Sequence, residues 1–295
     1  MKHESIALSR QMMTVILEHV RIVKEHLRCN ATITYNDFLV LLALQEAGEP
    51  VGAETLADYA ILQRGTVAAM LQEMQKAGLV ARTSSEDDGR VMLYSITREG
   101  SAVARQCSAD LSAKLDEGIL LGLDQGEAGK AIRGSIRGAC DHLRGHRHGM
   151  AIEGGWLPNP ICADYLLYWR AITEKWTSVA AEHGLALGEY RMLEYLDEFG
   201  TASTGDLACR LGIKQSNVSL YKRRLLERGL LHEAMDPFDG RKVAVRSTKE
   251  GAAVFSRARK SMNIVAQQGH KALADADIMT MNVWYMQMYL NLWRS

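Results

Sequence analysis

The sequence lacks an excess of either charge and lacks any long hydrophobic run. Its 295 residues include 35 basic and 35 acidic side chains, so a general polycation and a basic tail are excluded. The longest apolar runs, such as Phe38 to Leu44, fall well short of the ~20 residues that a membrane-spanning helix needs. The first residues lead into a helical pattern that contains Glu18 and Arg21, unlike a secretory signal. We therefore expect a cytoplasmic protein with no membrane partner.

Proline and cysteine are too few or too scattered to define a special class of protein. Four prolines and 25 glycines exclude a collagen-like or low-complexity chain. No pair of cysteines is spaced as Cys-x-x-Cys, which favours reduced, buried thiols over a disulfide framework and leaves a thiol sensor as the alternative. The five are Cys29, Cys107, Cys140, Cys162 and Cys209. The sequence also has no phosphate-binding glycine loop, no nucleophile elbow and no His-Glu-x-x-His motif, so it predicts neither an enzyme nor a cofactor.

The two halves of the sequence match each other when one is shifted by 151 residues. The matches include Leu56-Ala57 with Leu207-Ala208, Gly78-Leu79 with Gly229-Leu230, Asp88-Gly89-Arg90 with Asp239-Gly240-Arg241, and Glu99-Gly100 with Glu250-Gly251. Further upstream the shift is 152 residues, which pairs Phe38 with Tyr190 and Leu41 with Leu193. This order predicts a tandem duplication. We place the two domains at residues 1–150 and 151–295, on either side of a break rich in glycine and proline.

Each repeat contains the same predicted elements. A long amphipathic helix comes first, and in the second repeat its apolar positions are Tyr165, Trp169, Ile172, Trp176 and Val179. In the first repeat three shorter helices follow, at about 34–47, 53–60 and 64–77, with Gly48 and Gly78 as stops. A hairpin with an Asp-Gly turn comes next, and then a long helix with Thr97 or Thr248 as its N-cap. The last helices carry Ile132, Ile136, Ala139 and Leu143 in the first repeat and Met281, Trp284, Met288 and Leu292 in the second. The expected fold is mainly α (α+β): tandem winged helix-turn-helix domains with small β-hairpin wings and a helical pseudo-dimer interface.

A set of ordered motifs recurs in both halves. In the second half they are Leu185-x-x-x-Glu189-Tyr190-Arg191-Met192-Leu193, Leu207-Ala208, Val218, Leu226-x-x-Gly229-Leu230, Asp236-Pro237-x-Asp239-Gly240-Arg241 and Thr248-x-x-Gly251. In this order they resemble the MarR family of bacterial transcriptional regulators. The resemblance covers about 70 residues of each half and implies binding to double-stranded DNA. Family members are usually homodimers joined by their terminal helices. We therefore expect this chain to be a monomer with internal pseudo-twofold symmetry that carries both protomers covalently.

The third helix of a winged helix-turn-helix is suited to the major groove of DNA, and the two candidates differ in chemistry. Helix 214–228 has five basic residues and one acidic residue, whereas helix 63–77 has two and one. The candidate DNA-binding residues are Lys214, Gln215, Ser216, Asn217, Ser219, Lys222 and Arg223 in the second repeat, and Arg64 and Thr66 in the first. The alternative for the basic helix is a solvated charged face. We expect an operator whose two halves are unequal, with most of the affinity supplied by the second repeat.

The hairpin tips carry further candidate DNA-binding cations: Arg90 in the first wing, and Arg241 and Lys242 in the second. An arginine beside an Asp-Gly turn can reach the minor groove or a phosphate. The resemblance implies that an acidic residue before the turn orients this arginine. Asp236 and Asp239 match that pattern in the second wing, whereas Ser85 replaces the first acid in the other. The alternative is an Asp–Arg pair that only stiffens the turn.

The resemblance also implies a site for a small aromatic effector among the opening, second and dimer-forming helices. Candidates in the second half are Tyr165, Tyr168, Trp169, Trp176, Tyr190 and Met192, and in the first half Met12, Met13, Ile16, His19, Tyr35 and Phe38. Aromatic and methionine side chains suit a planar apolar ligand. The alternative is that these residues are simply core.

One histidine cluster suggests a different function. Cys140, His142, His146 and His148 lie near the break between the repeats, and His142 and His146 are one helical turn apart. We favour a solvated junction there and predict no metal. Two functions follow: a ligand-responsive regulator, expected to be a repressor, or a winged-helix interaction or metal/redox-sensing module that does not read DNA. The sequence names neither the operator nor the effector.

Overall fold

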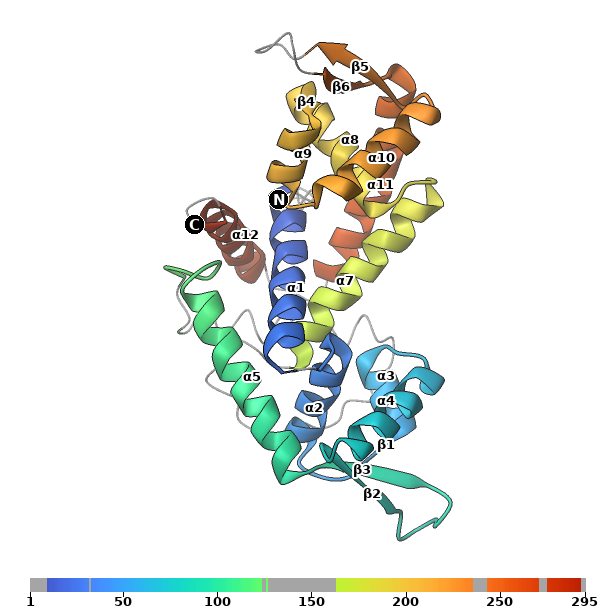
Figure 1. The fold of residues 1–295 in the computed structure, drawn as a ribbon, viewed down its shortest axis with the longest axis vertical. Helices are drawn as coiled ribbons and strands as arrows, with labels where there is room; N and C mark the ends of the chain where they lie inside the picture. The colour runs from blue at the N-terminus through green and yellow to red at the C-terminus, as the bar shows by residue number, and fades with distance from the viewer. Residues whose placement is uncertain are drawn as a thin grey trace. The chain divides into compact units, whose positions relative to one another are not determined.

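The computed structural model describes residues 10–31, 33–123, 126, 163–235, 243–270 and 275–292 (Figure 1). The last helix predicted for the first repeat, Cys140, Cys162 and the histidine cluster lie outside these ranges. The first repeat contains α1 (Arg10–Asn30), α2 (Tyr35–Ala47), β1 (Val51–Gly52), α3 (Ala53–Ala60), α4 (Arg64–Lys76), β2 (Val80–Ser84), β3 (Met92–Ile96) and α5 (Arg98–Asp116). The second contains α7 (Ala163–Glu182), α8 (Leu187–Phe199), β4 (Thr201–Ser203), α9 (Thr204–Leu211), α10 (Gln215–Glu227), β5 (Leu231–Met235), β6 (Val243–Ser247), α11 (Lys249–His270) and α12 (Asp275–Asn291).

The helix ends follow from local polar residues at the predicted positions. Thr34 accepts a hydrogen bond from the backbone N–H of Asp37, and Asp37 accepts one from the N–H of Thr34, which forms a capping box at the start of α2. Gly48 ends α2 in the left-handed conformation, at φ 69°, where only glycine is free of Cβ strain. Thr97 caps α5 by accepting from the N–H of Gly100 at 3.0 Å. The predicted caps and stops of the first repeat are therefore confirmed.

Each repeat forms a small antiparallel sheet of three strands. The strand orders are β1-β3-β2 and β4-β6-β5, so the hairpin of each wing gains a third, very short strand from the segment before α3 or α9. In the first hairpin Val80 pairs with Ile96 and Ser84 with Met92. The sequence predicted the hairpins but not β1 and β4, because two or three residues are too few to show an alternating pattern. The predicted fold class, mainly helical with tandem winged helix-turn-helix units, is confirmed.

A glycine three residues into α5 and α11 explains one of the repeated motifs. A Cβ at Gly100 would overlap the carbonyl of Leu79, and a Cβ at Gly251 would overlap the carbonyl of Leu230. The first turn of each long helix thus lies directly on the residue before β2 or β5. Because no other residue fits this approach without moving the backbone, the glycine recurs in both repeats.

The compact units of the structure are not two consecutive stretches of chain. Unit 1 contains the residues up to Glu18 and Ile172–His270, and unit 2 contains His19–Ala171 and the residues from Lys271 on. Helices α1 and α7 therefore each begin in one unit and end in the other. Within unit 2, α12 is held to the segment after α5, because the Asn291 side chain donates hydrogen bonds to the carbonyls of Ile119 and Leu121 at 3.1 and 2.8 Å. The division of the sequence at residue 150 stays a prediction about the repeats.

The core of each unit is built from the predicted apolar positions. Phe38, Leu41 and Leu44 of α2 are buried in unit 2, and Leu193, Leu207 and Val218 are buried in unit 1. Within the described ranges, every helix is too short or too polar to cross a membrane.

Candidate nucleic-acid interface

Helix α10 presents one apolar face and one polar face. Val218 and Leu225 are buried, seven residues apart, which directs the opposite side of the helix to solvent. That exposed side carries Gln215, Ser216, Asn217, Ser219, Arg223 and Arg224, and Lys214 just before it is exposed as well. The α10 N-cap, Lys214, makes no side-chain cap, and its carbonyl accepts from the N–H groups of Asn217 and Val218, so an anion such as a phosphate at this end would meet the N–H groups of Gln215 and Ser216.

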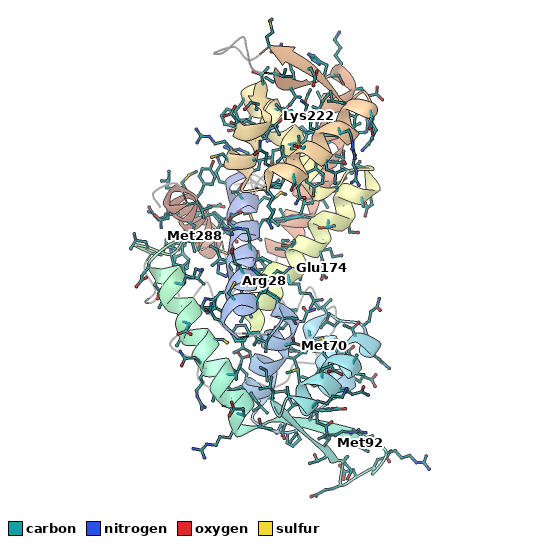
Figure 2. The ribbon with its side chains drawn as sticks, viewed as in Figure 1. Arg28, Met70, Met92, Glu174, Lys222 and Met288 are labelled. Atoms are coloured by element: carbon teal, nitrogen blue, oxygen red, sulfur yellow. The ribbon has the colours of Figure 1, made fainter. Side chains whose placement is uncertain are left out.

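Three of the predicted DNA contacts on α10 have partners within unit 1. Lys222, labelled in Figure 2, has a side chain only 19% exposed and pairs with Glu233 of β5 at 3.0 Å. The Ser219 hydroxyl donates to the Gln215 carbonyl at 2.9 Å, and Arg223 lies 3.8 Å from Glu227 on the same exposed face. Lys222 thus joins α10 to the wing, whereas the Arg223 pair is exposed and weak enough to exchange for a phosphate.

Two contacts hold α10 against the start of α8. Gly188 lies so close to the Tyr221 ring that a Cβ there would overlap the ring carbons. Arg228, at the C-terminal end of α10, lies 3.5 Å from Glu189, whose side chain is 4% exposed. Glu189 also accepts a hydrogen bond from the backbone N–H of Ala186 at 2.9 Å. Sequence reasoning missed these two contacts. The available signal was a difference between the repeats: Asn36 and Met70 of the first repeat occupy the positions that match Gly188 and Tyr221.

Helix α4 has the same length as α10, 13 residues, and exposes different side chains. Val67, Leu71 and Met74 are buried, and the exposed residues include Arg64, Gly65, Thr66 and Ala69. Arg64 forms an ion pair with Glu54 of α3, so its charge is partly neutralised. Lys76 pairs with Glu73 at 2.6 Å. Both cations of this helix therefore have acidic partners, and its exposed residues Gly65 and Ala69 have no side-chain hydrogen-bonding group.

The first wing is described in full, and its tip is exposed. The N–H of Arg90 donates to the Asp88 carboxylate at 2.9 Å, and the N–H of Asp87 donates to the Ser85 hydroxyl at 3.3 Å. Asp88 thus stabilises the turn through the backbone, in the manner of an Asx turn, and the Arg90 side chain stays exposed. In the second wing Asp236, Asp239, Arg241 and Lys242 lie outside the described residues.

The candidate effector residues fall into two groups that differ from the grouping by repeat. Met12, Met13, Ile16, Trp176, Tyr190 and Met192 belong to unit 1, and His19, Tyr35, Phe38, Tyr168 and Trp169 belong to unit 2; all of these are buried. The side chain of Tyr165 lies outside the described residues. In unit 2 the His19 ring lies 5.5 Å from that of Trp169, which lies 6.0 Å from Tyr285. The exchange of α1 and α7 between the units causes this regrouping.

Unit 1 has a buried polar cluster that sequence reasoning missed. On α8, Tyr190, Arg191 and Glu194 are buried, and Arg191 donates hydrogen bonds to the Leu211 carbonyl at 2.6 Å and to Thr14 of α1 at 3.3 Å. Glu194 Oε2, the Tyr190 hydroxyl and Trp176 Nε1 are all buried, and among the described residues no group hydrogen-bonds to Trp176 Nε1. The sequence did contain a signal for this cluster: two charged residues, Arg191 and Glu194, lie three positions apart inside the apolar pattern of α8.

Burial shifts the pKa values of both cores. In unit 1 it raises the pKa of Glu194 to about 7, against the opposing charges of Arg191, Arg10 and Arg259, and lowers the pKa of Arg191 to about 10. It also raises the pKa of Tyr190, and the Glu194 carboxylate adds to that shift. In unit 2 burial lowers the pKa of His19 to about 3, so this ring is neutral at physiological pH. The described residues include no cluster of three potential metal ligands.

Comparison with known proteins agrees with the two repeats. Models of the MarR family match residues 31–91 and residues 185–243. The organic hydroperoxide resistance transcriptional regulator of Bacillus subtilis is 33% identical over 106 residues, which are 35% of this chain and 67% of that protein. The regulator SarZ of Staphylococcus aureus is 29% identical over 101 residues, 34% of this chain and 64% of SarZ. The chain thus spans about two thirds of the length of these relatives.

Solved structures of similar proteins include MarR of Escherichia coli without ligand, with a TM-score of 0.37 and 16% identity over 40% of this chain and 88% of that one. A MarR variant from the same organism in complex with operator DNA has a TM-score of 0.35 and 17% identity over the same shares of the two chains. Two models of the same family match the chain, one in each repeat, and a relative is 33% identical. Together these matches show the family. The chain belongs to the MarR family of transcriptional regulators and contains two MarR-like winged-helix repeats.

Proposed function

We propose that the chain is a DNA-binding transcriptional regulator, a repressor, in which α10 of unit 1 supplies most of the affinity. The observation that carries this is the exposed face of α10, with Gln215 and Asn217 able to bond base edges and Arg223 and Arg224 able to neutralise phosphates. Membership of the MarR family and the names of its relatives support a regulator over an interaction module.

The two third helices support an operator with unequal halves. A homodimer carries two identical helices and favours a palindrome with half-sites about 10 base pairs apart. In this chain, α10 presents Ser216, Arg223 and Arg224 where α4 presents Gly65, Gln72 and Glu73. We infer that α4 adds only modest contacts, together with Arg90 of its wing.

The experiment is a salt-dependent titration of the whole chain with duplex DNA from the gene's own upstream region. Because phosphate neutralisation releases counterions, log K should fall linearly with log salt. Base substitutions in the half-site under α10 should cost about 1–3 kcal/mol each, and those under α4 much less. Affinity that is equal for every sequence, or absent at low salt, would favour the interaction module.

The covalent link between the repeats supports a monomer as the binding species. A linked second half docks at an effective concentration on the order of mM, so binding competence should survive dilution. Sedimentation velocity of the protein–DNA complex checks this: one chain per operator is expected, and two chains per operator would contradict it.

For the effector we propose a small aromatic compound with a hydrogen-bonding substituent, taken up in unit 1 next to Trp176, Tyr190 and Glu194. These three side chains have buried polar atoms that an aromatic acid or phenol could bond. Quenching of tryptophan fluorescence by hydroxybenzoates, with release of bound DNA, tests this. Quenching should be lost in Trp176→Phe and kept in the matched unit 2 variant Trp169→Phe.

A further inference from the structure

The turn between α3 and α4 of unit 2 has a strained residue and an arginine that holds it. Ile61 has φ 52°, and it is the single non-glycine residue with positive φ among those described. Arg170 of α7 donates hydrogen bonds from Nη1 to the Ala60 carbonyl and from Nη2 to the Ile61 carbonyl, both at 2.6 Å. A β-branched side chain disfavours the left-handed conformation, so the turn needs such an outside partner to stay in place.

The matching turn of unit 1, between α9 and α10, is held in a different way. Gly212 takes the left-handed position at φ 60°, which is free of Cβ strain. Arg191 of α8 bonds the Leu211 carbonyl and also reaches Thr14 of α1. The Glu18 carboxylate of α1 lies directly on Gly212, where a Cβ would overlap it. Here the arginine comes from within the same repeat, and the opening helix contributes an acid.

The sequence duplication makes Glu18 and Arg170 equivalent residues. The shift of 152 residues that pairs Phe38 with Tyr190 also pairs position 18 with position 170, and the shift of 151 pairs Ile61 with Gly212. Each of the two side chains comes from the opening helix of one repeat and contacts the helix-turn-helix turn of the other repeat. Glu18 and Arg170 have opposite charges, which fits the difference between the two turns. Arg191 already supplies a cation to the turn of unit 1, whereas the residue of α2 that matches Arg191 is Leu39.

We propose that Glu18 and Arg170 are positioning residues that fix the two helix-turn-helix turns and thereby the directions of α10 and α4. The proposal rests on the proposed DNA-binding function, since the third helices are the parts that would enter the groove. Neither side chain needs to touch DNA, because each acts through the turn residue at its end. The opening helix of each repeat is thus part of the DNA-binding head of the other.

The first test measures amide hydrogen exchange in the free protein. In Arg170→Ala, the N–H groups of Leu62 and Val67, bonded to Ala57 and Gln63, should exchange about tenfold faster, while amides of α2 and α5 keep their rates. Arg170→Lys should give an intermediate rate, because an ammonium group cannot bond both carbonyls in the same fixed geometry. Lys175→Ala, an exposed cation on the same helix, is the matched control and should change nothing.

A rescue variant separates positioning of the turn from general support of the fold. Adding Ile61→Gly to Arg170→Ala removes the backbone strain and should restore most of the slow exchange at Leu62. Unchanged exchange in Arg170→Ala would overturn the proposal, as would faster exchange throughout unit 2 that Ile61→Gly fails to restore.

The second test concerns Glu18 and DNA. Glu18→Ala should weaken binding about fivefold to tenfold and leave the slope of log K against log salt unchanged, because no phosphate contact is lost. Glu18→Gln, which keeps the shape, should bind more tightly than Glu18→Ala. Wild-type affinity in both variants, or a changed slope, would overturn the role of Glu18. If the wild-type chain binds no DNA, the proposed function fails, and the exchange measurements at the turn still decide whether Arg170 positions it.

Discussion

The two winged-helix units share a frame and differ in the surfaces that a partner or a ligand would meet. Thr97 and Thr248 cap their long helices with equivalent hydrogen bonds, and Gly100 and Gly251 lie on the matching carbonyls of Leu79 and Leu230. The exposed faces of α4 and α10, in contrast, have different charges and hydrogen-bonding groups. Features that backbone geometry demands have persisted in both copies, and side chains that face solvent have diverged.

The interiors of the units have diverged as well. Unit 1 buries Arg191 and Glu194 on α8, whereas the matching positions of α2 in unit 2 are Leu39 and Leu42. Unit 2 instead places the neutral ring of His19 beside Trp169. A polar core costs desolvation and is retained where its groups have another use, which makes unit 1 the better candidate for a regulated unit.

The largest expected effect concerns charge on the third helices. Replacing Lys214, Arg223 and Arg224 together by Ala should weaken DNA binding by about 100-fold or more at moderate salt, because about three phosphate or base contacts are lost. The matched variant of unit 2, Arg64→Ala with Lys76→Ala, should change affinity by less than about threefold. Fluorescence anisotropy at several salt concentrations measures both. Equal losses would show that the two helices contribute equally.

A smaller effect is expected when the core of unit 1 is given the residue of unit 2. Arg191→Leu removes the donor to the Leu211 carbonyl and the nearest cation of Glu194, so the free energy of unfolding of unit 1 should fall by about 3 kcal/mol. Leu39→Met, which nearly keeps the volume of its buried side chain, should cost less than about 1.5 kcal/mol in unit 2. Urea unfolding monitored by amide exchange separates the units. An unchanged free energy of unfolding in Arg191→Leu would contradict this role of Arg191.

Glu194 predicts that unit 1 is more stable at mildly acidic pH. Its folded pKa, about 7, lies above the 4.5 of an ordinary Glu, so the folded state binds more protons than the unfolded state between these values. Stability should therefore fall by about 2 kcal/mol as pH rises from 5 to 7. Glu194→Gln should abolish this dependence. Exchange in peptides of α8 and α11, corrected for intrinsic rates, measures it, and a flat wild-type profile would contradict the assignment.

His19 predicts the opposite and slightly smaller response in unit 2. Because its folded pKa is about 3, the unfolded chain takes up the proton first as pH falls below 6.5. Unit 2 should lose about 1.5 kcal/mol of stability between pH 6.5 and 5, and His19→Phe should remove that loss while keeping a ring beside Trp169. Exchange in peptides of α2 and α5 reports this unit. If both units respond to pH in the same direction, the contrast between their cores is wrong.

The parts of the fold that depend on nearby residues were predictable from the sequence. The ends of α2, α3 and α4, the hairpins and the Thr97 cap follow from capping residues, glycines and periodicity, which act within a few positions. The exposed face of α10 also follows from its own pattern. The pairing of Lys222 with Glu233 did not, because it depends on how a strand passes the helix.

The sequence could not show which unit each effector candidate belongs to, because this too depends on how distant segments pack. Met13 and Tyr35 were expected together because they lie in one repeat, and the structure places Met13 in unit 1 and Tyr35 in unit 2. Periodicity shows which face of a helix is buried and leaves open which partner buries it. Arg191 and Glu194 were missed for the same reason, because the hydrogen bonds of Arg191 depend on Thr14 of α1 and on the end of α9.

The sharing of α1 and α7 between the units has a consequence for synthesis. Unit 2 needs Asn291, whose amide bonds the Ile119 and Leu121 carbonyls across about 170 residues of chain, and unit 1 needs residues 10–18. Unit 2 therefore cannot be completed on the ribosome when the first repeat emerges, because it must wait for α12, whereas the residues 10–18 that unit 1 needs are made before its own repeat. The nascent first repeat carries uncovered apolar surface for most of translation, so folding of this protein in the cell should depend on chaperones more than the size of one MarR-like repeat suggests.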